Sequence, residues 1–361
     1  MNNPNQPSIL RAGDRVLVTG AAGFVGSAVT RVLLGRGAEV RALLQPGADQ
    51  ANLDDMDVER VVADVRDHHA VLGAMAGVRY VCHVAALYRF WSRDPGEFYE
   101  VNVGGTLNVL RAALEERCRR VVYTSTVGTI GLDGTGLGRP ATEADWPRAE
   151  HLFGSYKRSK YVAEHEVLRL AASGLPVVLV QPTLPVGPRD RAPTPTGRVV
   201  LDFLNGRIPG WFDTAMNVVD VEDVAAGHLA ALEHGRQGRS YVLGGENMTF
   251  KAILDLLADE TGLPRASMRV PARLALGAAH LSEFVQGTVA RRPPLVPLEG
   301  ARMATTRMIF SDERARQELG YESRPAREAL VRSARWFVEN GYVRPSRVGN
   351  IRWKAADPAP A

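Results

Sequence analysis

Short apolar segments alternate with longer segments of helical periodicity through the first half of the chain. The apolar segments are too short for helices and predict buried strands, which are Arg15–Thr19, Glu39–Leu44, 58–63, 80–84, Arg120–Thr124 and 175–180. Apolar residues at helical spacing predict helices at 24–34, 70–76, 98–116 and Ser155–Ala172. This alternation implies right-handed crossovers and a parallel sheet with helices on both faces. The predicted fold class is α/β, a doubly wound parallel sheet.

The pattern changes in the second half of the chain. Residues 185–215 are rich in Pro and Gly and carry no regular period. Beyond them the periodicity predicts a strand at Ser240–Leu243 and helices at 221–233, 249–262, 274–289, 311–319 and 326–340. From residue 344 the chain is rich in Pro and Ala, and we expect residues 344–361 to be a disordered tail.

Composition and charge exclude several classes of protein. The chain has 361 residues, 45% of them hydrophobic, which is enough for a large core. Its 44 basic and 40 acidic residues are interspersed and no basic tract forms, so we expect no nucleic-acid partner. The two cysteines lack metal-ligand spacing and fit a reducing compartment, so no metal site is expected. No signal peptide or membrane-spanning segment is evident, and we expect a cytoplasmic protein.

Three glycines follow the first predicted strand at equal spacing. Gly20, Gly23 and Gly26 lie between that strand and the helix predicted at 24–34. Strand, glycine turn and helix in this order form the context of a dinucleotide-binding fingerprint. The glycines allow the backbone to approach a pyrophosphate, and the helix N-terminus offers N–H groups to the anion. The spacing is G-x-x-G-x-x-G, and the alternative is a tight turn without a ligand.

The residues that would bind the adenosine part of a dinucleotide give a weaker signal than the glycine turn. The second strand ends at Gln45, which is neither the acid that binds a ribose nor the base that binds a 2′-phosphate. The sequence therefore leaves NAD and NADP as alternatives. Asp64, after the third strand, is a candidate to accept a hydrogen bond from the adenine amino group, and its alternative role is to cap a turn.

The predicted helix Ser155–Ala172 carries the most informative pair. Tyr156 and Lys160 are four residues apart and lie on one helix face. A phenol has a pKa near ~10 and a neighbouring ammonium lowers it. Tyr156 could then exchange a proton with a substrate oxygen while a nicotinamide carbon exchanges hydride with the adjacent carbon. Thr124, Ser125 and Thr126 end the preceding strand and offer hydroxyls for the same oxygen. The alternative is a pair on a surface helix.

Together these motifs resemble an extended short-chain dehydrogenase/reductase. The motifs are 19–26, 83–86, Asn102, 124–126 and the Tyr156/Lys160 pair. Three longer stretches, 153–166, 181–208 and 217–246, resemble the hopanoid-associated sugar epimerases of bacteria. The similarity extends from about residue 15 to about residue 342. It implies a Rossmann-type fold with a smaller C-terminal substrate-binding lobe.

The resemblance also implies a domain organisation. Residues 1–14 would be a flexible N-terminus and 15–184 the NAD(P)-binding Rossmann domain. Residues 185–343 would form the substrate-binding lobe, with 217–244 returning to the Rossmann domain. Members of this superfamily commonly form homodimers through two helices, which implies a dimer through 98–116 and Ser155–Ala172 here.

A role for each matched residue follows from the resemblance. Tyr156 would be the acid/base, Thr126 the catalytic hydroxyl and Lys160 the residue that modulates Tyr156 and binds the cofactor ribose. Asn102 would support the lysine through water. The residues that would contact the cofactor are Gly20, Ala22, Gly23, Phe24, Val25, Gly26, Gln45, Asp64, Val65, Ala85, Ala86, Ser125, Tyr156, Lys160, Pro182 and Thr183.

Candidate substrate residues favour two different ligands. Arg189 and Arg198 could hold a phosphate, as a sugar nucleotide would require. Tyr88 and Trp91 follow the fourth strand and, with Trp211, suit an apolar or ring-shaped substrate. The alternatives are arginines on a surface loop and aromatic residues in the core.

The first hypothesis for function is an NAD(P)-dependent sugar or sugar-nucleotide epimerase that acts on a secondary alcohol or ketone, linked to hopanoid biosynthesis. An alternative is an NADPH-dependent ketone or aldehyde reductase similar to dihydroflavonol reductase. An alternative of another class is a non-catalytic nucleotide-sensing scaffold, which the intact Tyr156 and Lys160 disfavour. The family association also allows peripheral contact with a membrane.

Overall fold

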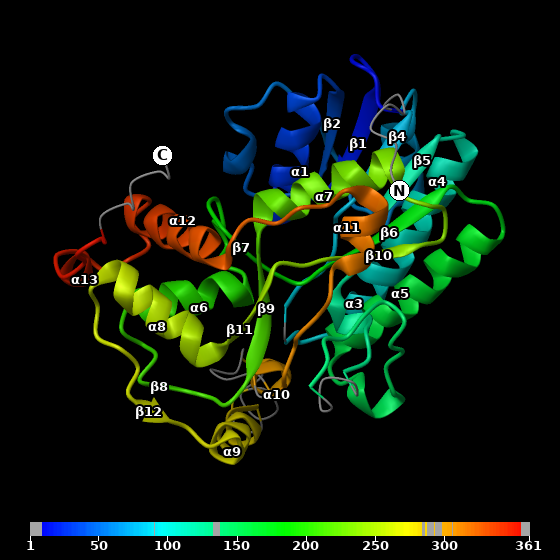
Figure 1. The fold of residues 1–361 in the computed structure, drawn as a ribbon. Coiled ribbons are helices and arrows are strands. Elements are labelled where there is room, and N and C mark those ends of the chain that lie inside the picture. Colours follow the sequence, from blue (N-terminus) through cyan, green and yellow to red (C-terminus); the bar gives the residue numbers. More distant parts are fainter. Residues whose placement is uncertain are drawn as a thin grey trace.

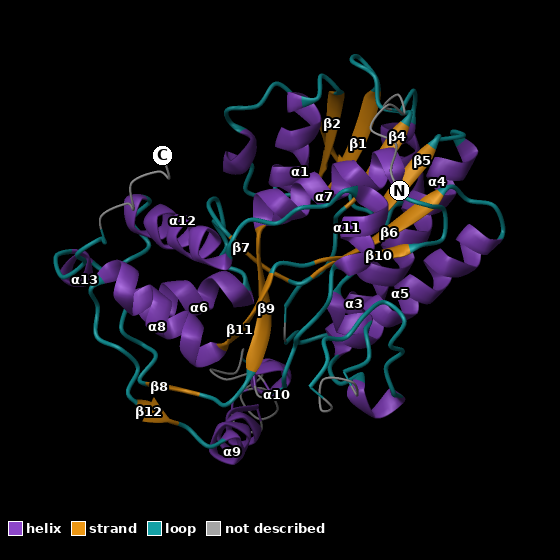
Figure 2. Ribbon diagram, viewed as in Figure 1, coloured by secondary structure: helices purple, strands orange, loops and turns teal. Residues whose placement is uncertain are grey.

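A seven-stranded parallel sheet forms the centre of the larger domain (Figures 1 and 2). The computed structural model describes residues 9–89, 91–132, 138–283, 286, 292, 298–304 and 306–354. The strand order is β10-β6-β5-β4-β1-β2-β3, and every neighbouring pair is parallel. The strands are β1 (Arg15–Thr19), β2 (Glu39–Leu44), β3 (Glu59–Val62), β4 (Tyr80–His83), β5 (Arg120–Thr124), β6 (Val177–Pro182) and β10 (Ser240–Leu243). The predicted doubly wound Rossmann-type sheet is confirmed.

Helices cover both faces of this sheet, as the alternation of strands and helices requires. Val16 and Val18 of β1 face one side, with α1 (Phe24–Gly35), α7 (Val221–His234) and α11 (Glu313–Leu319). Leu17 faces the other side, with α2 (His68–Met75), α4 (Thr106–Glu115) and α5 (Ser155–Ala172). Because the strands are apolar on both faces, two hydrophobic cores sandwich the sheet.

A smaller lobe lies beside the sheet domain and has its own core (Figure 1). It contains a three-stranded sheet of order β11-β9-β7 and a two-stranded sheet, β12-β8. These strands are β7 (Leu184–Val186), β8 (Gly210–Trp211), β9 (Ala215–Asp220), β11 (Glu246–Thr249) and β12 (Met268–Arg269). The helices are α6 (Pro195–Leu204), α8 (Phe250–Thr261), α9 (Ala272–Ser282), α10 (Leu298–Ala304), α12 (Ala326–Glu339) and α13 (Pro345–Val348). Although α7 and β10 lie among the segments of the smaller lobe in the sequence, they belong to the main sheet domain. There β10 pairs with β6, and α7 packs against α1.

The segment predicted as one helix at 98–116 is divided into three parts. It consists of α3 (Gly96–Tyr99), a π-helical segment at Glu100–Gly105, and α4. Gly105 packs so closely that a Cβ there would lie 2.6 Å from Val65 Cγ2. The apolar periodicity gives no sign of the wider turn, which is a feature often found at functional sites.

The described residues near both ends of the chain, 9–14 and 344–354, pack on the folded protein. Residues 344–354, predicted to be disordered, contain α13, and Ile351 is buried in the core of the smaller lobe. The Arg344 N–H donates to Asn205 Oδ1 at 3.0 Å, which fixes the start of this segment. Near the N-terminus, Leu10 is buried within the predicted flexible segment 1–14. Residues 1–8 and 355–361 lie outside the described part of the chain, as does the end of the helix predicted at 274–289.

Candidate active site

The carboxyl ends of β1, β4, β5 and β6 meet at one edge of the main sheet. The chain order reverses between β1 and β4, and ligands bind at this point in doubly wound sheets. The segments that follow these four strands carry most of the predicted site residues. They include the glycine turn, Ala85 and Ala86, Ser125 and Thr126, and Pro182 and Thr183.

The backbone of the glycine turn packs too closely to accept side chains at Gly20 and Gly26. Gly20 has a φ of +67°, and a Cβ on Gly26 would lie 2.0 Å from the Gly20 carbonyl oxygen. The N-cap of α1 is Gly23, which has no side chain that could cap the N–H groups of the first turn. That turn also carries no acidic residue. Together these features fit the phosphates of a dinucleotide, which need a close backbone approach and free N–H groups.

A buried histidine joins β1, β4 and α4 behind this turn. Thr19 Oγ1 lies 2.7 Å from His83 Nδ1, and His83 Nε2 lies 3.0 Å from Thr106 Oγ1. The Ala85 N–H donates to Thr19 Oγ1 at 3.1 Å, and Ala85 also contacts Gly20. Burial, and then the charge of Lys160, lowers the pKa of His83 to about 3, so the ring is neutral at pH 7. Ala86, one residue further, is exposed at the edge of the sheet.

Gln45, at the end of β2, is uncharged and gives a 2′-phosphate no cation. Gln45 is exposed, and its carbonyl accepts from the Ala48 N–H at 3.1 Å in a turn. Arg41 points away from this end, because its Nη1 donates to the carbonyls of Ala74 and Ala76 at 2.7 and 2.8 Å. Arg41 is therefore not placed to make that contact.

The Asp64 carboxylate accepts hydrogen bonds within its own turn. It accepts from the Arg66 N–H at 2.9 Å and from Arg66 Nη2 at 2.7 Å, and these contacts lower its pKa. The turn-capping alternative therefore describes its side chain, and the adenine contact stays a prediction. Val65 is buried against the π-helical segment, and its carbonyl accepts from Asn108 Nδ2 at 3.0 Å.

Tyr156, in the first turn of α5, meets two of the predicted partners. Its ring centroid lies 4.8 Å from that of Tyr88, and Thr126 lies near its hydroxyl. Burial raises the pKa of Tyr156, and the neighbouring Thr126 only partly offsets this. The phenol is therefore protonated at neutral pH. This reverses the expected direction of the shift, because Lys160 is not among the groups that perturb Tyr156 here.

Lys160 is buried and bonded to β5 instead. Its Nζ donates to the Tyr123 hydroxyl and to the Thr124 carbonyl, both at 2.8 Å. It also lies 4.4 Å from the centroid of the Tyr123 ring. An ammonium has three donors, so one remains for a ligand. Burial lowers the pKa of Lys160 to about 7.

Glu164 was not identified from the sequence, and it organises the polar side chains beneath the site. Its carboxylate accepts from the Ser125 hydroxyl, from Thr129 Oγ1 at 2.8 Å and from Gln181 Nε2 at 3.2 Å. Ser125, predicted to lie near the nicotinamide, thus directs its hydroxyl to this carboxylate. The signal that could have revealed Glu164 is its spacing, one turn after Lys160 on the same face of α5.

Asn102 holds the segment after β4 against α5. Its Oδ1 accepts from the Leu87 N–H at 2.7 Å, and its Nδ2 donates to Ser159 Oγ at 2.9 Å. Among the described contacts Asn102 makes no hydrogen bond to Lys160, which lies one residue after Ser159. Support of the lysine through water stays a prediction.

The segment after β6 connects the two lobes. Pro182 ends β6 and is buried, and the Thr183 N–H donates to the Leu243 carbonyl at 3.2 Å. The side chain of Thr183 is also buried. The predicted contact of this segment with a carboxamide is compatible with its place at the sheet edge.

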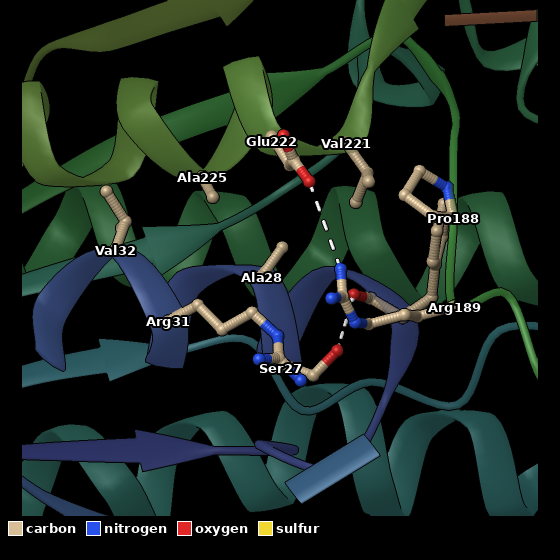
Figure 3. Close-up of a pocket in the computed structure, with 10 residues that line it drawn as sticks. Ser27, Ala28, Arg31, Val32, Pro188, Arg189, Val221, Glu222 and Ala225 are labelled. Carbon is tan, nitrogen blue, oxygen red and sulfur yellow. Dashed lines mark hydrogen bonds and ion pairs between the residues drawn. The ribbon is translucent and has the colours of Figure 1, made fainter. Parts of the chain in front are cut away.

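The candidate arginines do not line one common site. Arg189 enters a pocket of about 240 Å³ between α1 and α7, where Glu222 lies 3.9 Å away (Figure 3). Its carbonyl and that of Ala22 both accept from Asn52 Nδ2, so the Arg189 loop adjoins the glycine turn. Arg198 is exposed on α6.

The candidate aromatic residues also lie in different parts of the structure. Tyr88 lies against Tyr156, while Trp91 is half-buried after β4. Trp211 lies in β8 with Arg269 5.7 Å above its ring, and it packs on the core of the smaller lobe. Phe90, between the first two, lies outside the described residues.

An apolar cavity of about 110 Å³ lies in the smaller lobe and is bounded by Tyr88, the residue whose ring packs on Tyr156. Tyr88 forms part of its wall, and the remaining lining is almost entirely aliphatic. The residues that line it are Tyr88, Leu184, Val186, Pro195, Thr196, Val199, Val200, Met216, Val218, Ile253, Thr306, Met308 and Leu330. No charged side chain belongs to this lining.

Comparisons with known proteins agree with this geometry. The sequence profile of the NAD dependent epimerase/dehydratase family matches residues 16–244. A protein of Synechocystis sp., provisionally named dihydroflavonol 4-reductase, is 40% identical over 335 residues, which cover 92% of this chain and 96% of the relative. Sterol demethylase protein B of Methylococcus capsulatus is 36% identical over 329 residues, 91% of this chain and 99% of the relative. The crystal structure of gox2253 has a TM-score of 0.81 at 40% identity and covers 92% of this chain and 100% of its own.

Proposed function

The chain belongs to the NAD dependent epimerase/dehydratase family of extended short-chain dehydrogenases/reductases, and we propose that it reduces a ketone on an apolar substrate to a secondary alcohol. The observation that carries this proposal is the apolar cavity bounded by Tyr88, which packs on Tyr156. A cavity lined by aliphatic side chains favours a hydrocarbon body, since a diphosphate or sugar would lose hydration there without gaining partners.

The residues of the site suit the donation of a proton. A bound NAD(P) cofactor supplies the hydride. Tyr156 is protonated at neutral pH, so its O–H can donate to the ketone oxygen as the alcohol forms. Thr126, beside Tyr156, offers a second hydroxyl to the same oxygen. The free donor of Lys160 suits a ribose hydroxyl.

The sugar-nucleotide epimerase hypothesis draws less support from the site. An epimerase of that kind needs cations that hold a diphosphate on the substrate side. Arg189 is turned toward Glu222 and α1, and Arg198 is exposed, so neither guanidinium lines the apolar cavity. We therefore place the ketone reductase first. The link to hopanoid biosynthesis stays a prediction.

We also propose a homodimer through α4 and α5. Leu114 on α4 and Val162 on α5 are 59% and 40% exposed, which is unusual for large apolar side chains on helices that cover a sheet. Light scattering of the purified protein tests this proposal, and a monomeric mass at micromolar concentration would exclude it.

The test of the proposed function is reduction of apolar ketones by the purified protein. We expect a small apolar ketone such as cyclohexanone to oxidise NADH or NADPH, and the loss of nicotinamide absorbance follows this reaction. UDP-glucose should give no turnover. Tyr156→Phe should lower kcat/KM about 100-fold or more and leave the cofactor Kd nearly unchanged. Tyr161→Phe, on the same helix, is the matched control. Conversion of UDP-glucose without net oxidation of cofactor would refute the proposal.

A further inference from the structure

The outer side of α9 and β12 carries an exposed apolar stripe. Met268, Leu274 and Leu281 are 56%, 67% and 65% exposed. Leu274 and Leu281 are seven residues apart, which places them on one face of the helix, and the exposed Gly277 and Ala278 lie between them. A surface of this kind on a globular protein marks a site of interaction.

The charged side chains within residues 261–282 are basic, and acidic residues lie next to this segment. Residues 261–282 contain Arg265, Arg269, Arg273 and His280, and no acidic residue. Arg265 and Arg269 form ion pairs with side chains outside this segment. Arg273 is exposed, and no ion pair joins it to the part of the chain that the structure describes. Within the described residues the surface therefore combines exposed leucines with one exposed arginine, Arg273, that forms no ion pair.

We propose that this surface, the α9 face, rests on an anionic lipid bilayer. Helices that lie in the interface of a membrane combine an apolar face with arginines or lysines, and anionic lipids attract those cations. Trp211 is half-buried at the edge of the face, beneath Arg269, and tryptophan is enriched at the level of lipid headgroups. No helix among the described residues is long and apolar enough to cross a bilayer, so the contact would be peripheral.

The α9 face lies close to the candidate active site. α9 packs against α10, and the two helices lie together at the lower edge of the molecule in Figure 1. Glu299 of α10 contacts Gly154 at the start of α5, the helix that carries Tyr156. An apolar ketone could reach the active-site region from the bilayer along this side of the molecule. This last step rests on the proposed function, whereas the membrane contact does not.

Sedimentation with vesicles tests the membrane contact without any substrate. The full-length protein should sediment with vesicles of phosphatidylcholine and phosphatidylglycerol, and much less with phosphatidylcholine alone. The double variant Leu274→Ser/Leu281→Ser should bind about tenfold less, and Arg273→Gln should weaken binding only to the anionic vesicles. Val62→Ser, which changes an equally exposed apolar residue on β3, should bind like the wild type.

Three outcomes would overturn the inference. They are no sedimentation with either vesicle, sedimentation that the double variant leaves unchanged, and a loss of self-association in that variant by light scattering without any vesicle binding. The last result would assign the α9 face to a second copy of the chain. Failure of the ketone assay would leave the vesicle result intact, so the two proposals fail separately.

Discussion

Lys160→Met should stabilise the protein at acidic pH and destabilise it at alkaline pH. Burial lowers the pKa of Lys160 from 10.5 to about 7. Because the folded protein binds this proton less tightly than the unfolded chain, the charged lysine costs folding free energy below pH 7. That cost fades as the pH rises from 7 toward 10.5.

The magnitude follows from the size of the shift. At about 1.4 kcal/mol per pKa unit, the cost is about 5 kcal/mol at pH 6 and about 1 kcal/mol at pH 10. Methionine removes this cost but leaves the Tyr123 hydroxyl and the Thr124 carbonyl without their donor, at about 1.5 kcal/mol each. The variant should be more stable by about 2 kcal/mol at pH 6 and less stable by about 2 kcal/mol at pH 10.

Urea unfolding followed by circular dichroism at the two pH values measures this difference. Lys251→Met, on the exposed side of α8, is the control and should show the pH dependence of the wild type. The change of about 4 kcal/mol between the two pH values does not depend on the lost hydrogen bonds. An equal pH dependence in Lys160→Met and the wild type would refute the reasoning, because Lys160 would then titrate as it does in the unfolded chain.

Three further substitutions test the cofactor and substrate regions. Gly26→Ala should abolish NADH binding measured by calorimetry, because its Cβ would lie 2.0 Å from a backbone oxygen, whereas Gly73→Ala has open space and should bind normally. Gln45→Arg should favour NADPH over NADH by about tenfold in Kd, and an unchanged ratio would place the ribose elsewhere. Val199→Gln should raise the KM of an apolar ketone about tenfold without changing the cofactor Kd, since the amide loses hydration in the cavity. An unchanged KM would show that the substrate lies outside the cavity.

The sheet domain was largely predictable because its signals are local. Strands buried on both faces appear as short apolar runs, and α5 and β10 have the bounds that the periodicity predicts. The glycine turn could be located because its steric demands exclude other residues. The π-helical segment and the ordered C-terminal segment depend on packing against distant residues, Val65 and Asn205, and no local pattern reports them.

The sequence indicated which segments gather at the candidate site, but not its electrostatics. Tyr156 and Tyr88 lie side by side, and the roles predicted for the site residues stay predictions. The direction of the Tyr156 pKa shift depends on burial and on where the Lys160 ammonium points, and both are set by tertiary packing. The apolar cavity is lined by side chains from both lobes, so its character appears only once the chain is folded.

The most direct test of the account is transfer of deuterium from the reduced cofactor to the substrate. NADH or NADPH labelled with deuterium at the transferred position of the nicotinamide is incubated with the enzyme and an apolar ketone, and the product is analysed by mass spectrometry. The account predicts an alcohol with one deuterium on the carbinol carbon, and loss of this product in Tyr156→Phe. Unlabelled alcohol, or labelled alcohol formed equally well by Tyr156→Phe, would contradict it.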